Sequence, residues 1–68
     1  MHQQIRDAKA EELGATGWRV GINWSFVHGF PTETLASQYA EHIRITEKRE
    51  RVHTEKEQDG TYTVAIHF

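Results

Sequence analysis

Two segments of the chain alternate between apolar and polar residues with a period of two. In residues 17–30 six large apolar residues fall on even positions, with His28 as the only polar residue of that parity after Trp18: Trp18, Val20, Ile22, Trp24, Phe26 and Phe30. In residues 61–68 the even positions are Tyr62, Val64, Ile66 and Phe68. Successive side chains of a strand point to opposite faces of a sheet. Each segment is therefore predicted to be a strand with one buried and one exposed face.

A helix is predicted between these strands, over residues 32–46. Pro31 disfavours helical geometry at the residue before it, and the hydroxyl of Thr32 can cap the first turn. The apolar residues that follow form one stripe at helical spacing, made of Leu35, Ala36, Tyr39, Ala40 and Ile43. Such a stripe is enough to cover one face of a sheet.

Residues 47–59 are strongly charged, with both signs mixed, and allow two interpretations. In the first, the helix continues to about Arg51, supported by an i,i+4 pair with Glu47. In the second, the helix ends near Ile45 and residues 49–58 form a polar edge strand. Asp59-Gly60 favours the second interpretation, because this pair is typical of a tight hairpin turn with positive φ at both positions.

The N-terminal segment, residues 2–13, has the composition of a helix, and Gly14 suits the position just after its end. Its apolar content is thin, and so short a helix is marginal in isolation. The segment is therefore either a helix that docks on a neighbour or a tail. The sequence leaves open whether that neighbour is the same chain or a second copy.

The predicted fold class is a small α+β domain with β-α-β-β order. Its three-stranded antiparallel sheet comprises residues 17–28, 49–58 and 61–68, with the main helix on one face. The chain is read as one domain, 1–68, in which 1–14 is the N-terminal helix or tail and 17–68 is the core. The predicted buried residues are Trp18, Val20, Ile22, Trp24, Phe26, Leu35, Tyr39, Ile43, Tyr62, Val64 and Ile66. The β-α-β-β order is topologically similar to that of the dodecins, small flavin-storing proteins, without a matching binding motif.

Length and composition limit the classes of function. The chain has 68 residues, no cysteine and a formal net charge of −2. We expect no disulfides, no thiolate metal site and no membrane span. The N-terminus lacks an apolar signal-peptide core, which favours a cytoplasmic protein. Nucleic acid is disfavoured as a partner, because there is no basic excess. In addition, every strand aromatic has the parity of the buried face, which removes a base-stacking platform.

Candidate chemistry rests on the histidines and the aromatic row of the first strand. The chain has five histidines, but none lies in a recognised metal-ligand motif. His28 and His42 are the only two that helix–sheet packing is expected to bring together. No serine has the setting of a catalytic nucleophile. We therefore expect no enzymatic activity, no catalytic residue, no cofactor and no metal. The alternative is a small ligand-binding domain of flavin or metal type, or an enzymatic domain, that uses the aromatic row with His28 and His42.

The length of the first strand predicts self-association. Its apolar strip spans roughly 13 residues, about 40 Å at 3.3 Å per residue. The main helix is only about 20 Å long at 1.5 Å per residue, so the excess strip needs another cover. We therefore expect a homodimer, and a protein–protein interaction module that acts as an adaptor or inhibitor, with an unidentified protein partner as a further option. A nucleic-acid-binding accessory protein is the third hypothesis. The candidate interface residues are Trp18, Val27, Phe30, His67 and Phe68.

Overall fold

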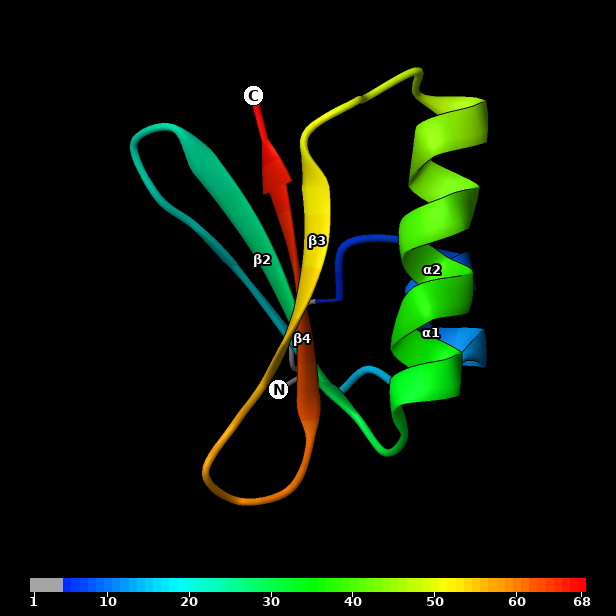
Figure 1. Ribbon diagram of the computed structural model, residues 1–68, viewed down its shortest axis with the longest axis vertical. Helices are drawn as coiled ribbons and strands as arrows, with labels where there is room; N and C mark the ends of the chain where they lie inside the picture. Colours follow the sequence, from blue (N-terminus) through cyan, green and yellow to red (C-terminus); the bar gives the residue numbers. More distant parts are fainter. Residues whose placement is uncertain (1–4) are drawn as a thin grey trace.

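The computed structural model describes residues 5–68, and they form a small α+β fold. Its helices are α1 (Ala8–Glu12) and α2 (Glu33–Thr46), and its strands are β1 (Gly17–Val20), β2 (Trp24–Phe30), β3 (Val52–Lys56) and β4 (Tyr62–His67). The strands form one antiparallel sheet in the order β1-β2-β4-β3. Both helices lie on the same side of this sheet (Figure 1). The fold class is confirmed, but the described part of the chain has four strands rather than three. Its β-β-α-β-β order also removes the likeness to the dodecins.

The predicted first strand is in fact a hairpin. β1 ends at Val20 and β2 begins at Trp24, and the N–H of Gly21 donates to the carbonyl of Trp24 at 2.7 Å across the turn. The strand partners on either side of this turn have opposite parity, as in the pair Trp18–Val27. Even positions of β1 therefore share a sheet face with odd positions of β2. The prediction of one continuous apolar strip is wrong for this reason.

A bulge near the end of β2 reverses the parity a second time. Val27 pairs with Val64, whereas Phe30 pairs with Tyr62, so the register shifts by one residue between them. Gly29 lies in this bulge with φ of +94°, a conformation that glycine adopts at little cost. As a result, Phe30 joins Val27 in the core, and both side chains are fully buried.

The core lies between the two helices and the sheet face that they cover, here called the helix side. Its largest fully buried side chains are Tyr39, Phe30, Ile43, Ile66, Val27 and Val64. Four of these, on α2 and β4, were predicted from the sequence. The prediction is wrong for Val20, Ile22, Trp24 and Phe26. Ile22 is 95% exposed and Val20 is 54% exposed, while Trp24 and Phe26 lie on the opposite face of the sheet.

The main helix and the second hairpin follow local sequence signals. The Thr32 hydroxyl accepts from the N–H of Leu35 at 3.2 Å, and the helix runs from Glu33 to Thr46. The second interpretation of the charged segment is thus confirmed, although β3 is shorter than predicted. The turn differs from the prediction, because the N–H of Glu57 donates to the carbonyl of Thr61 around a three-residue loop. Gly60 alone in this loop has positive φ, as in hairpins with a bulged turn.

The N-terminal segment docks on its own chain. α1 is only five residues long, and Ala10 and Leu13 are buried in the core with Ile5 packed against them. The part of the predicted helix formed by residues 2–4 lies outside the described residues. The described residues of this segment therefore dock in cis, on their own chain, and not on a second copy.

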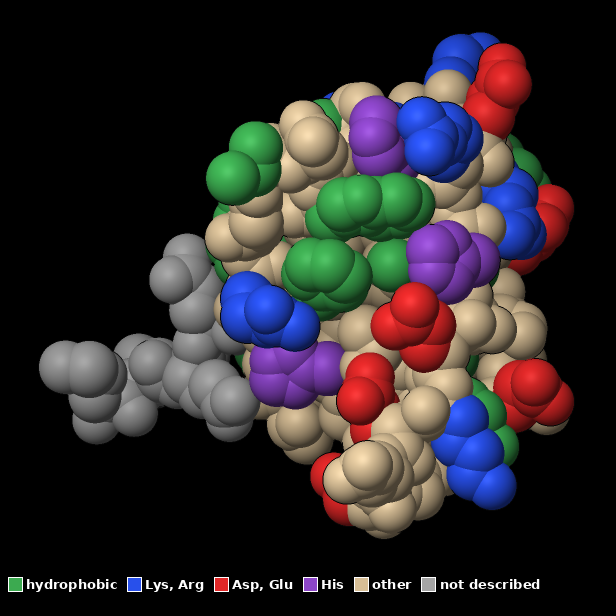
Figure 2. Space-filling view, turned by 60° about the vertical axis from the view of Figure 1, so that its left-hand side comes forward, with side chains coloured by type: hydrophobic (Ala, Val, Ile, Leu, Met, Phe, Trp, Pro, Cys, Tyr) green, Lys and Arg blue, Asp and Glu red, His purple; other side chains and the backbone are tan. Residues whose placement is uncertain are grey.

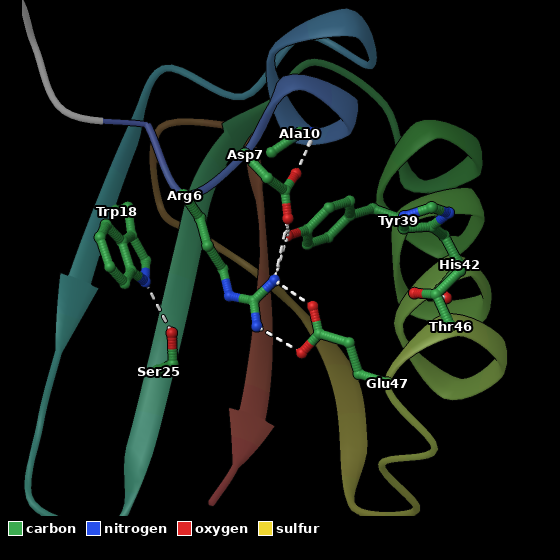
Figure 3. Close-up of polar contacts among 9 residues, drawn as sticks. All are labelled: Arg6, Asp7, Ala10, Trp18, Ser25, Tyr39, His42, Thr46 and Glu47. Atoms are coloured by element: carbon green, nitrogen blue, oxygen red, sulfur yellow. Dashed lines mark hydrogen bonds and ion pairs between the residues drawn. The ribbon is translucent and has the colours of Figure 1, made fainter.

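Arg6 joins this segment to the C-terminal end of α2 (Figure 3). Its guanidinium donates to Glu47 at 2.8 Å, to Asp7 at 2.9 Å and to the hydroxyl of Tyr39 at 3.1 Å. The Tyr39 hydroxyl in turn donates to Asp7 at 2.9 Å. Asp7 also caps α1 by accepting from the N–H of Ala10 at 2.8 Å. The network therefore ties residues 6–7 to both helices.

This network predicts an alkaline limit to stability. Burial and the hydrogen bond to Asp7 raise the pKa of Tyr39 well above its usual value of 10.0. Above that pH the unfolded chain releases the Tyr39 proton while the folded chain retains it, so rising pH favours unfolding. Tyr39→Phe is expected to cost about 1 kcal/mol at neutral pH through the lost hydrogen bond. It should also reduce the loss of stability above pH 10, by up to about 1.4 kcal/mol per pH unit.

Urea unfolding of both proteins at several pH values from 7 to 11 measures this effect. Below pH 10 the two stability curves should run parallel, and above it they should converge. Curves that stay parallel up to pH 11 would show that the Tyr39 hydroxyl ionises as readily in the folded chain as in the unfolded one.

Candidate functional site

The sheet face away from the helices, here called the open face, carries two large aromatic side chains. Trp24 and Phe26 project from the central strand β2, and both are only partly buried. Their ring centroids lie 6.4 Å apart with an interplanar angle of 23°. Figure 2 shows hydrophobic side chains at the centre of this face, with basic, histidine and acidic side chains around them. The two near-parallel rings therefore form an apolar cluster on this face, here called the Trp24–Phe26 platform.

Cationic and imidazole side chains from neighbouring strands surround the platform. The guanidinium of Arg19, on β1, lies 4.6 Å from the centroid of the Phe26 ring, and that of Arg51 lies 5.8 Å from the Trp24 ring. The imidazoles of His53 and His67 meet the Trp24 ring edge-on, with centroids 5.4 and 4.7 Å away. Positive groups thus flank both rings, in a cation–π arrangement at each.

Acidic side chains lie mainly at the other end of the open face. Glu55 contacts His53 at 3.2 Å. Farther along, Glu57 and Asp59 share the wall of a shallow depression with Arg19 and His28. Hydrogen bonds from the side chain and backbone of Thr61 lower the pKa of Asp59. The open face therefore changes from basic around the platform to acidic at the β3–β4 loop.

A second surface lies at the tip of the first hairpin. Val20, Ile22 and Phe68 are 54%, 95% and 52% exposed, and we call these three residues the apolar hairpin end. The N–H of Phe68 donates to the carbonyl of Asn23 at 2.9 Å. This bond holds the end of β4 beside the turn, so the three apolar side chains gather at one end of the sheet.

The predicted interface residues are divided among four environments. Val27 and Phe30 are fully buried in the core. Trp18 is partly buried on the helix side, and its indole N–H donates to Ser25 at 2.7 Å. His67 lies on the open face, and Phe68 belongs to the apolar hairpin end. An interface that uses the whole predicted set would require the core to open.

The alternative ligand site is not assembled in the structure. His42, on α2, stacks with Tyr39 at a centroid distance of 6.2 Å on the helix side, whereas His28 lines the depression of the open face. The sheet separates these two histidines, and the aromatic row is split between its two faces. Within residues 5–68, no three His, Asp or Glu side chains come together in a way that could hold a metal ion.

Sequence reasoning missed the platform and the arginines beside it. The available signal was Gly21 and Asn23, two residues typical of turns, inside an otherwise apolar alternation. A turn placed there would have reversed the parity of Trp24 and Phe26 and predicted them on an exposed face.

Comparison with known proteins gave no match to a family model, a curated protein or a solved structure. The function must therefore be argued from the geometry of these two surfaces. In the described part of the chain, neither helix has the length and apolar composition needed to cross a membrane.

Proposed function

We propose that this protein is a small non-enzymatic protein–protein interaction module that pairs with a second copy of itself through the apolar hairpin end. The observation that carries the proposal is the exposure of three large apolar residues, Val20, Ile22 and Phe68, at the same end of the sheet. Exposed apolar groups that gather in this way mark interaction sites more often than isolated ones do. The length of the first strand no longer supports a dimer, because that strand folds back as a hairpin.

The edge of the sheet favours a second copy as the partner. β1 is an edge strand of the described sheet. Gly21 is hydrogen-bonded to Trp24, and bonding alternates along an antiparallel ladder. The backbone N–H and C=O groups of Trp18 and Val20 therefore point to the outer edge. A two-fold axis beside β1 would pair these groups with the same groups of another copy.

One register of this pairing suits the side chains well. If Val20 faces its own copy, Arg19 lies opposite Gly21 rather than opposite a second Arg19. Like charges placed directly across a strand pair are destabilising, so this register avoids the main electrostatic cost. It also places both copies of Val20 at the two-fold axis, with both copies of Ile22 close to it.

Val20→Lys is the variant that tests the interface. Lysine on an edge strand opposes strand pairing, and each dimer loses the burial of two half-exposed valines, each worth about half of the 1.5–3 kcal/mol of a full burial. Sedimentation equilibrium at micromolar concentrations should give twice the 7.9 kDa monomer mass for the native chain. We expect Val20→Lys to raise the dimer dissociation constant at least about tenfold.

Ile45→Lys is the matched control. Ile45 is 65% exposed near the end of α2, away from the hairpin tip, so the same chemical change there should leave the dimer intact. Both variants should keep the native circular dichroism spectrum, because both side chains are largely exposed. A native chain that sediments at 7.9 kDa at every concentration, or a dimer that both variants weaken equally, would refute this interface.

A further inference from the structure

We propose that the open face binds single-stranded nucleic acid, with bases stacked on the Trp24–Phe26 platform and phosphates held by Arg19 and Arg51. This surface is separate from the apolar hairpin end, so the proposal does not depend on self-association. It also reverses the expectation drawn from the sequence. The sequence pattern disfavoured nucleic acid because it placed every strand aromatic on the buried face, whereas the hairpin turn places Trp24 and Phe26 on the open face.

The first line of evidence is the orientation of the two rings. Both rings project from the inner strand β2, 23° from parallel with centroids 6.4 Å apart, and are only partly buried. Partly exposed aromatic rings on a sheet face are the groups on which the known sheet-face readers of single strands stack bases. Stacking of this kind tolerates any base, because every base has a π-face.

The second line of evidence is the charge around the rings. The net charge of the chain is −2, yet the charged groups in contact with the platform are the two guanidiniums of Arg19 and Arg51. The imidazoles of His53 and His67 also contact the Trp24 ring, and they can donate hydrogen bonds. Glu55, on the same strand as His53, is engaged by the His53 imidazole at 3.2 Å. Cations concentrated on an aromatic platform in an acidic chain match a ligand that combines flat rings with phosphate.

The acidic end of the face limits the length and the course of the ligand. Glu57 and Asp59 would repel phosphates at the β3–β4 loop, so the strand should cross the platform rather than follow the face to that loop. Two rings accommodate about two bases by stacking. A duplex is disfavoured, because its bases are already stacked and present only their edges. The ligand is thus a short single-stranded segment.

Fluorescence anisotropy with labelled ten-nucleotide U-rich RNA and T-rich DNA tests the proposal in low salt. We expect saturable binding to one or both strands, and comparison of the two arms shows whether the 2′-hydroxyl contributes. Trp24→Leu keeps an apolar side chain but removes the π-face, and should weaken binding about 5- to 100-fold. Trp24→Phe keeps a ring and should restore most of the affinity. Trp18→Phe alters the helix side and should leave the dissociation constant unchanged.

A charge series separates phosphate contacts from stacking. Arg51→Glu should weaken binding and reduce the slope of log Kd against log salt concentration by about one. Lys9→Glu makes the same change in net charge on α1, where the native lysine pairs with Glu12, and should leave the slope unaltered. The Val20→Lys variant should bind with native affinity, so failure of the dimer and failure of this proposal can be told apart.

Three results would overturn the proposal. The first is no saturable binding to either strand. The second is equal binding by Trp24→Leu and the native chain. The third is tighter binding of a labelled poly-glutamate peptide or a duplex of the same length than of either single strand. The third result would show that the face recognises negative charge rather than unstacked bases.

Discussion

Phe30→Ala is expected to unfold most of the protein at physiological temperature, whereas Ile22→Ala should leave its melting temperature nearly unchanged. The Phe30 ring is fully buried and lies 5.4 Å from the ring of Tyr39. Truncating a buried phenylalanine costs about 3–5 kcal/mol. A domain of this size has a free energy of unfolding near the lower end of the roughly 5–15 kcal/mol range, so this loss removes most of it.

Ile22 is the matched control because it is also a large apolar residue of the same sequence alternation. It is 95% exposed in the turn, and exposed substitutions of this kind change stability by less than about 0.5 kcal/mol. Thermal melts followed by circular dichroism compare the two variants. One continuous strand, as predicted from the sequence, requires Ile22→Ala to be the damaging change. That outcome would contradict the hairpin and its bulge together.

Elements with local signals were predictable from the sequence. The proline and the capping threonine before α2 define where the helix begins, because their effects act within one turn. Asp59-Gly60 located the second hairpin for the same reason, although the loop has three residues rather than two. The apolar stripe of α2 and the even positions of β4 gave core residues that the structure confirms.

The face on which each strand residue lies was not predictable in the same way for residues 17–30. The alternation of apolar and polar residues continues unchanged through a tight turn. The even residues before the turn, however, share a sheet face with the odd residues after it. The bulge at Gly29 changes the parity again, which returns Phe30 to the core. Two local irregularities therefore decide which aromatics are buried, and periodicity averaged over the segment contains neither of them.

The candidate surfaces depend on this same choice of face. Arg19, Arg51 and the two imidazoles come from three different strands or their flanks, and only the strand order β1-β2-β4-β3 brings them around Trp24 and Phe26. Their sequence separation hides this neighbourhood. The net charge of −2 for the whole chain also gave no indication of basic groups gathered around the platform.

Gly29→Ala is expected to destabilise the protein by about 2–5 kcal/mol, from backbone strain and overpacking together. Gly29 has φ of +94°, and an added Cβ would lie 2.9 Å from the backbone nitrogen of Thr16 and still closer to its hydroxyl. Thr16 has little room to withdraw, because its N–H donates to the carbonyl of His28 at 2.9 Å. The bulge directs the Phe30 side chain into the core, and it must therefore distort or open in this variant.

Gly60→Ala separates the two causes of this loss. Gly60 has a similar φ of +90°, but an added Cβ there meets nothing within 4 Å. Its cost should be the conformational part alone, about 1–2 kcal/mol. Urea unfolding of both variants gives the difference, which measures the close approach of Thr16 to the bulge. Equal losses would show that Thr16 moves aside freely. In that case the contact between Thr16 and β2 would not hold the bulge in place, and the burial of Phe30 would have to rest on the packing of its ring alone.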